Sequence, residues 1–391
     1  METIKLYYED AYIKEFTAKV LSCVETESKV SGVKYAVCLD KTAFFPEEGG
    51  QTPDKGTIGD ARVLDVQIKD EVITHYTDKA VAIGENVKAA IDWKHRFSNM
   101  QQHTGEHIFS GIVNSKFGYE NVGFHLSDQI VTMDYNGPMT KEELEEIEYL
   151  VNEAIARNVE VTQSFPTKEE LKSFEYRSKK EIPGQVRIVT VEGYDVCACC
   201  APHVSRTGEI GGFKIQSSMN YKGGVRVSML CGFRALEAAR AKAEIVASLM
   251  KNLSANQENI VEIVDKQKAN IQTLKQELVA VKKELLNREL KAIDEGEEHV
   301  IFFCEGIDGK TVRQAVLELA TKHSGYCMLL SGNDNSGYSY VAASESLDCK
   351  KLETVMKEAL SAKGGGDSKM IQGSMSKCAE EIERVYREFL K

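Results

Sequence analysis

The chain has 391 residues, with 49 Lys and Arg against 60 Asp and Glu, and its formal net charge of −11 excludes a uniformly basic nucleic-acid binder. Apolar residues make up 42% and charged residues 28%, which is the composition of a soluble globular protein with about two to four domains rather than of a disordered chain. No apolar run approaches the roughly 18 residues of a membrane helix, and acidic residues stand near the N-terminus where a signal peptide would be basic, so we expect a cytoplasmic protein without a membrane partner.

Short alternating apolar stretches fill residues 1–90, in a pattern typical of β-strands. The clearest stretches are 33–39, 61–68 and 72–76, and glycine-containing turn sequences at 48–51 and 57–60 lie between the first two. These features predict a small antiparallel β-barrel of the translation-factor type over residues 1–90.

The apolar period becomes helical after Trp93. Residues 96–114 and 141–158 are each predicted to form an amphipathic helix, and strand-like segments follow at 186–191 and 225–230. We therefore expect a domain of mixed α+β structure over residues 91–233.

Residues 234–292 contain neither Gly nor Pro, and a predicted helical segment covers 234–295. Within it, residues spaced alternately four and three apart form the seam of a coiled coil. The seam consists of Ile260, Val264, Gln267, Ile271, Leu274, Leu278, Val281 and Leu285. The sequence leaves open whether this seam pairs with 234–253 in an intramolecular hairpin or with a second copy in a homodimer.

A compact α/β pattern occupies residues 296–391. We predict strands at 300–304, 327–331 and 338–343, a helix at 312–323, and two further helices flanking a loop at 363–369. The complete prediction is an α+β multidomain protein with a barrel, an α+β domain, a coiled-coil segment and a C-terminal α/β domain.

Two His and Cys motifs suggest a metal centre. His103 and His107 are four residues apart on a predicted helix, so both imidazoles can reach one ion, although a lone pair at this spacing is common by chance. Cys199 and His203 have the same spacing in a cluster that also contains Cys197 and Cys200. Together His103, His107, Cys199 and His203 form a nitrogen and sulfur donor set suited to tetrahedral Zn²⁺, with Cys197 and Cys200 as rival ligands. Buried thiols beside an exposed histidine are the alternative interpretation.

These motifs resemble those of the alanyl-tRNA synthetase editing domain. The resemblance covers 103–107 and 199–211, the preceding loop 44–51, the strand at 225–232, and a glycine-rich signature at 364–373 that is similar to the C-terminal DHHA1 domain. The motifs follow the order of the family, and the chain begins at the barrel, so it is most similar to the long form of the free-standing AlaX proteins.

The resemblance implies a hydrolase that deacylates mischarged Ser-tRNA(Ala), with Gly-tRNA(Ala) as a second candidate substrate, and that spares Ala-tRNA(Ala). It also implies that His103, His107, Cys199 and His203 bind Zn²⁺. Thr104, Glu106 and His125 are the candidates for lining the seryl pocket, and the implied tRNA-binding residues are Gly364, Gly365, Gly366 and Lys369. The partner is then tRNA(Ala), and no segment is available to bind ATP.

Two alternatives remain at the level of the sequence. The chain is alternatively a non-catalytic tRNA-binding or assembly protein with a structural zinc. Basic residues of the central region are candidates for phosphate contacts, but interleaved glutamates favour a charge-mixed solvated face equally well. These basic residues are Lys168, Lys172, Arg177, Lys179, Lys180 and Arg187.

Overall fold

The structure is a computed structural model that describes residues 2–173, 175–178 and 185–391. The chain divides into two compact units, Met1–Val246 and Ala247–Lys391. Its mixed α+β composition agrees with the prediction, and none of the helices in the described residues is long and apolar enough to cross a membrane.

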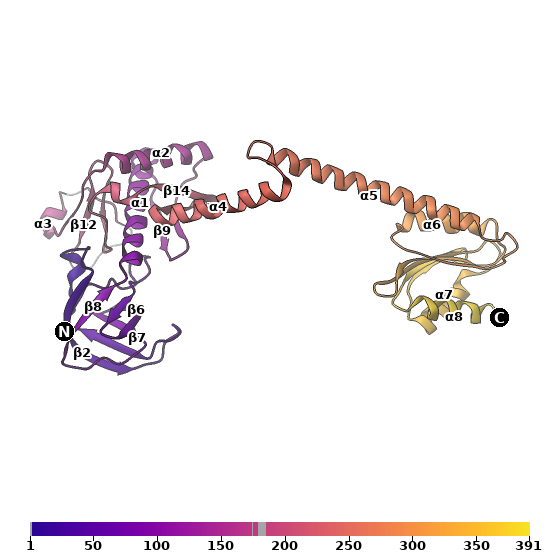
Figure 1. Ribbon diagram of the computed structural model, residues 1–391, viewed down its shortest axis with the longest axis horizontal. Coiled ribbons are helices and arrows are strands. Elements are labelled where there is room, and N and C mark those ends of the chain that lie inside the picture. Colours follow the sequence, from indigo (N-terminus) through magenta and orange to yellow (C-terminus); the bar gives the residue numbers. More distant parts are fainter. Residues whose placement is uncertain (1, 174, 179–184) are drawn as a thin grey trace. The chain divides into compact units, whose positions relative to one another are not determined.

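A closed six-stranded β-barrel forms the first part of unit 1, as the sequence predicted (Figure 1). Its strands, in the order in which they pair around the barrel, are β2 (Glu15–Glu25), β3 (Tyr35–Leu39), β7 (Val72–Thr77), β6 (Ala61–Lys69), β5 (Gly56–Ile58) and β8 (Asn86–Ile91). Strand β1 (Ile4–Lys5) pairs beside the barrel with β4 (Lys41–Thr42). Asp70 and Glu71 both adopt positive φ in the two-residue turn from β6 to β7, which is the backbone geometry that matches the twist of a tight hairpin.

His75 lies on β7 inside the barrel and is fully buried. Its Nε2 is 2.8 Å from Thr42 Oγ1 and its Nδ1 is 3.1 Å from the Val37 carbonyl oxygen. Since a carbonyl oxygen only accepts, the Nδ1 nitrogen carries the proton. Burial lowers the pKa of His75 from 6.5 to about 4, because the charged imidazolium would lose its hydration.

This histidine predicts an acid-sensitive barrel. Between pH 6.5 and about 4 the unfolded chain binds a proton at His75 that the folded chain does not, so the free energy of unfolding falls as the pH falls through this window. The expected loss from this group is on the order of 3 kcal/mol. Urea unfolding of wild type and His75→Gln at about pH 7 and about pH 4 measures it. Equal losses in both proteins would show that His75 does not cause the acid sensitivity.

Helix α1 (Trp93–Phe117) runs through the centre of the part of unit 1 that follows the barrel (Figure 1). The Asp92 side chain caps its N-terminus by accepting from the His95 N–H at 3.1 Å, and Gly118 ends it in the left-handed conformation at φ 70°. It packs against two sheets and against α2 (Lys141–Arg157), whose buried stripe includes Ile147.

The first of these sheets has four strands and the second has three. The first contains β14 (Phe213–Tyr221), β15 (Gly224–Cys231), β10 (Val131–Tyr135) and β9 (Asn121–Leu126), in this order. The second contains β11 (Val161–Ser164), β12 (Ile188–Val191) and β13 (Asp195–Ala198). A short helix α3 (Lys168–Leu171) follows β11. Because α1 contacts both sheets, side chains from either one can meet on its surface.

A buried ion pair joins the barrel to α1. Arg96 and Asp54 are both 0% exposed, and Nε of Arg96 lies 2.9 Å from Asp54 Oδ2. The guanidinium also donates to the carbonyl oxygens of Ala11 and Ala43, while the backbone N–H of Phe45 donates to the carboxylate. These contacts fix the start of α1 relative to the barrel, and with it the histidines about two and three turns further along.

The predicted helical segment forms two helices. Helix α4 (Gly232–Leu253) ends before Ser254, which has a φ of +50°, and α5 (Ile260–Lys291) follows. Five seam residues of α5 are between 52% and 62% exposed. They are Ile271, Leu274, Leu278, Val281 and Leu285.

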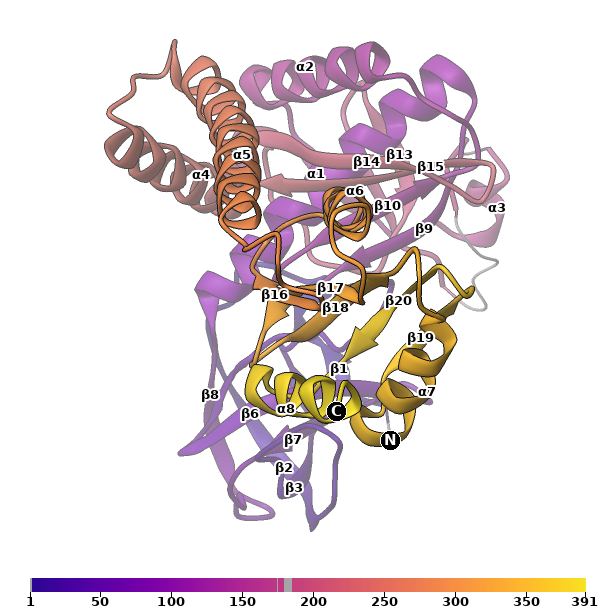
Figure 2. The same cartoon turned by 90° about the vertical axis from the view of Figure 1, so that its right-hand side faces the viewer.

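A five-stranded sheet is the centre of unit 2 (Figure 2). Its order is β16 (Val300–Cys304), β17 (Cys327–Asn333), β18 (Gly337–Ala343), β20 (Met370–Met375) and β19 (Lys363–Gly366). Helix α6 (Gly309–Ala320) packs with Leu286 of α5 on one hydrophobic cluster of the sheet. Helices α7 (Cys349–Leu360) and α8 (Ala379–Phe389) build the other cluster.

The prediction of a loop at 363–369 is wrong for residues 363–366. Residues Lys363–Gly366 form the edge strand β19, which pairs antiparallel with β20. Gly364 permits this pairing, because a Cβ on it would lie 2.2 Å from the Gln372 carbonyl oxygen. The low strand propensity of glycine concealed the strand in the sequence.

A candidate metal centre

Helix α1 supplies two imidazoles to a buried cluster. His103 and His107 lie on its inner face, at 3% and 2% exposure, with their ring centroids 5.4 Å apart. This is the outcome expected of an i, i+4 pair on one face of a helix.

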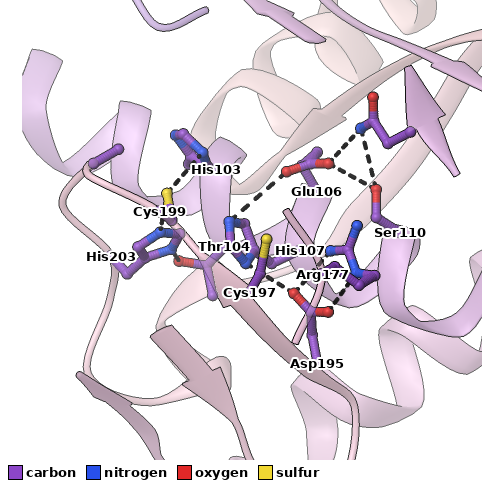
Figure 3. A network of polar contacts seen from close by, with 12 residues as sticks. His103, Thr104, Glu106, His107, Ser110, Arg177, Asp195, Cys197, Cys199 and His203 are labelled. Atoms are coloured by element: carbon purple, nitrogen blue, oxygen red, sulfur yellow. Dashed lines mark hydrogen bonds and ion pairs between the residues drawn. The ribbon is translucent and has the colours of Figure 1, made fainter. Parts of the chain in front are cut away.

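The loop after β13 supplies a thiol and a third imidazole. The Cys199 Sγ lies 3.5 Å from Nε2 of His103 and 3.3 Å from Nε2 of His203 (Figure 3). One ligand atom from each of His103, His107, Cys199 and His203 lies within 4.8 Å of the others. The structure therefore brings together all four residues predicted to bind the metal, and three nitrogens with one sulfur fit Zn²⁺.

The far nitrogen of each imidazole is held by another group. Nδ1 of His103 donates to the Gln51 amide oxygen at 2.7 Å. Nδ1 of His203 lies 3.1 Å from Oγ1 of Thr104, and Nδ1 of His107 lies 2.9 Å from a carboxylate oxygen of Asp195. An amide oxygen only accepts, so in His103 this contact leaves Nε2 with its lone pair directed at the cluster. In His107 the carboxylate faces Nδ1, which leaves Nε2 as the nitrogen that can bind an ion once its proton is lost.

The charges of the cluster also favour a cation. Burial alone would raise the pKa of the Cys199 thiol, but the neighbouring His103 holds it well below 9, so the sulfur is available as a thiolate. Burial lowers the pKa of His203 to about 3, which keeps that ring neutral. Burial also lowers the pKa of His107, but Asp195 and Cys199 outweigh it and raise the value to about 9. A metal ion would therefore displace a proton from His107.

Gln51 reaches the cluster from the barrel loop. The Leu126 N–H donates to the Gly50 carbonyl oxygen at 2.7 Å and the Thr52 N–H donates to the Leu126 carbonyl oxygen at 3.0 Å, so the loop lies along strand β9. Gly50 has a φ of +83°, and a Cβ there would lie 2.4 Å from the Phe124 carbonyl oxygen. The loop 44–51 was part of the sequence resemblance, but the sequence did not indicate that Gln51 contacts His103.

The three predicted pocket residues have different surroundings. The Thr104 hydroxyl donates to the Met100 carbonyl oxygen at 2.9 Å and lies beside His203, so this side chain supports a ligand from within α1. Glu106 is buried near His107 and accepts from Ser110 and Asn121 at 2.7 and 2.6 Å.

His125, the third predicted pocket residue, is not brought to the cluster. It is exposed, whereas its neighbour Phe124 packs on the His103 ring with a centroid distance of 4.9 Å. Successive side chains of a strand point to opposite faces, so Phe124 and His125 cannot both face His103. The prediction of a pocket role for His125 is therefore not supported by its position.

The two rival cysteines lie beside the cluster but outside the set of four. Cys200 faces the barrel loop, where a Cβ on Gly49 would lie 3.4 Å from its sulfur. Cys197 forms a second group with His107 and Asp195. Arg177 donates to both Asp195 oxygens, at 2.7 and 2.9 Å, and its positive charge opposes a second cation in that group.

Two of the predicted phosphate contacts are instead internal. Arg177 pairs with Asp195, and Arg187 donates to the carbonyl oxygens of Cys199 and Ala201 at 2.9 and 2.8 Å, which fixes the loop that carries the thiol. Lys179 and Lys180 lie outside the described residues. Lys168 and Lys172 remain exposed.

A cleft of about 170 Å³ borders the centre at His203. Tyr12, Gln163, Arg187 and Ser205 are among its lining residues. One of the four candidate ligands thus adjoins a space that is open to solvent.

The predicted tRNA-binding residues belong to unit 2. Gly364 and Gly366 lie in the edge strand β19, and Lys369 in the turn that leads to β20 is exposed. The backbone of Gly365 belongs to the same strand, so the four residues form one hairpin.

Two families match parts of the chain. Residues 186–228 match the family described as the threonyl and alanyl tRNA synthetase second additional domain, and residues 2–95 match the class II (A) tRNA synthetases. The first match contains Cys199 and His203, and the second covers the barrel.

Curated relatives match nearly the whole chain. The alanine–tRNA ligase of Ignicoccus hospitalis is 30% identical over 93% of this chain, which spans only 40% of the ligase. The alanyl-tRNA editing protein Aarsd1 of Danio rerio is 28% identical over 97% of this chain and 96% of its own length. The alanyl-tRNA editing protein AlaX-L of Pyrococcus horikoshii is 26% identical over 99% and 98%, respectively.

Proposed function

Because this chain is similar over nearly its whole length to alanyl-tRNA editing proteins, we propose that it is an aminoacyl-tRNA hydrolase that removes serine from mischarged Ser-tRNA(Ala) and spares Ala-tRNA(Ala). Gly-tRNA(Ala) is the second substrate of this proposal. The observation that carries it is the cluster of His103, His107, Cys199 and His203, three imidazoles and one thiolate in a protein whose full-length relatives are editing proteins.

We assign Zn²⁺ to this cluster, where it would polarise the ester carbonyl or orient the substrate. His103, His107, Cys199 and His203 would hold it. Gln51 and Thr104 keep two of these rings in place. The substrate is an activated ester, so the protein needs mainly to position water and stabilise an oxyanion.

Selection against alanine requires a polar group that pairs with the serine hydroxyl. A site whose buried polar group stays unpaired with alanine can discriminate by orders of magnitude. Nε2 of Gln51 is buried beside His103 and has no hydrogen-bond partner among the described residues. Its N–H groups are the donors that we assign to the seryl group.

The decisive experiment is the release of labelled serine from Ser-tRNA(Ala) by the purified full chain, with Ala-tRNA(Ala) as the parallel substrate. Rapid loss of serine with alanine retained is the expected result. Retention of both amino acids, by protein that contains zinc, would favour a non-catalytic tRNA-binding protein in which the metal only stabilises the fold.

We also assign the hairpin of β19 and β20 to tRNA contact. Its exposed glycine backbone permits close approach to a phosphate backbone, and Lys369 supplies charge at its turn. This assignment and a cytoplasmic location both follow from the proposed substrate.

The exposed seam of α5 supports a homodimer. Leu274, Leu278 and Val281 continue the spacing of a coiled coil while more than half of each side chain is exposed. We predict a dimer by size-exclusion chromatography with light scattering, and a monomer for the variant Leu274→Glu/Leu278→Glu. A monomeric wild-type chain at micromolar concentration would contradict the prediction.

A further inference from the structure

A buried chain of charged groups extends behind His107. Both Asp195 oxygens accept from Arg177, from Nε at 2.7 Å and from Nη2 at 2.9 Å, and one of them lies 2.9 Å from Nδ1 of His107 (Figure 3). The side chains of Asp195 and His107 are only 1% and 3% exposed. The Nδ1 atoms of the other two histidines, His103 and His203, lie beside uncharged groups instead, the Gln51 amide and the Thr104 hydroxyl.

The backbone brings this pair to α1. A Cβ on Gly111 would lie 2.2 Å from the Tyr194 carbonyl oxygen, so only glycine lets the turn between β12 and β13 approach the helix one turn beyond His107. Arg177 is attached to β13 by two hydrogen bonds, from its N–H to the Val196 carbonyl oxygen at 2.8 Å and from the Ala198 N–H to its own carbonyl oxygen at 2.9 Å. Both side chains are therefore positioned by main-chain contacts.

We propose that Asp195, held by Arg177, is the positioning residue that orients His107 for metal binding. A carboxylate that accepts from Nδ1 fixes the rotation of the ring and directs Nε2 at the ion, and it strengthens Nε2 as a ligand. Arg177 occupies both carboxylate oxygens from the other side, so Asp195 cannot turn away to bind the ion itself. The inference rests on the proposed metal centre and is independent of which aminoacyl ester is the substrate.

Metal affinity, measured with Co²⁺ and Zn²⁺ on the full chain, tests the proposal. For Asp195→Asn we expect affinity to fall about 10- to 100-fold, as is usual when the partner of a ligating histidine is lost. The visible absorption of bound Co²⁺ should change as well, because the ring of His107 is no longer fixed. Arg177→Lys keeps the charge but loses the fork geometry, and we expect a smaller loss of affinity in the same direction.

Asp134→Asn is the matched control. Asp134 forms a similar forked pair with Arg226, at 2.6 and 2.7 Å, on strands β10 and β15. We expect this variant to bind Co²⁺ with unchanged affinity and spectrum. Wild-type affinity and spectrum in both Asp195→Asn and Arg177→Lys would overturn the proposal. It would also be overturned if every variant with altered affinity had lost the circular dichroism of the folded chain.

The metal measurement is separate from hydrolysis. A wild-type chain that binds Co²⁺ but releases no serine would defeat the proposed function and leave the role of Asp195 standing. Unchanged metal binding by Asp195→Asn in a chain that hydrolyses Ser-tRNA(Ala) would do the reverse.

Discussion

Replacing Cys199 by serine is expected to remove the bound metal and to lower the rate of Ser-tRNA(Ala) deacylation by at least about 100-fold, or about 2.7 kcal/mol of transition-state stabilisation. Cys199 is the only member of the cluster whose ligand atom is an anion, and its sulfur contacts both His103 and His203. A serine hydroxyl stays neutral at this position and binds zinc poorly. Metal content and single-turnover deacylation of the same preparation measure the two effects.

Cys200→Ser is the matched control for this prediction. Cys200 is the adjacent residue, but its sulfur lies against Gly49 of the barrel loop rather than among the imidazoles. We expect this variant to retain metal and activity. Full activity in Cys199→Ser would remove the cluster from the reaction, whereas unfolding of Cys199→Ser on loss of metal would support a structural zinc.

The sequence was sufficient for the parts of the site that depend on local spacing. His103 and His107 share a face because a helix repeats every 3.6 residues, and Cys199 and His203 are four residues apart in one loop. The supporting residues Gln51 and Asp195 were not predicted to contact the histidines. Gln51 lies in a loop and Asp195 begins strand β13, and each approach depends on one glycine packed against backbone, Gly50 in the same loop for the first and Gly111 on α1 for the second.

The errors have equally specific causes. His125 was selected for its chemistry, but the side of the sheet that it occupies depends on the register of β9 against β10, where His125 pairs with Thr132. The glycine run at 364–366 was read as a loop because its strand is specified by pairing with β20 rather than by its side chains. Both errors concern long-range strand pairing, which a local pattern does not determine.

Loss of the Arg96 guanidinium should lower the free energy of unfolding of unit 1 by more than His75→Gln or Lys55→Met. Arg96→Met would leave the Asp54 carboxyl group 0% exposed, with the Phe45 N–H as its one remaining hydrogen-bond donor among the described residues. Breaking one side of a buried ion pair costs about 3–5 kcal/mol. Trp93, the one tryptophan of the sequence, lies one turn before Arg96, so its fluorescence during urea unfolding reports on this junction.

Two further variants separate buried charge from contact between the barrel and α1. Arg96→Met/Asp54→Leu removes both charges, and we expect it to recover most of the lost free energy of unfolding. Lys55→Met breaks a pair that also reaches from the barrel to the next part of unit 1, with Asp128 at 2.6 Å, but both of its side chains are more than 40% exposed. Its expected cost is below about 1 kcal/mol, because solvent screens an exposed pair. A double variant as unstable as Arg96→Met would show that the hydrogen bonds to Ala11 and Ala43, rather than the uncompensated carboxylate, hold the barrel against α1.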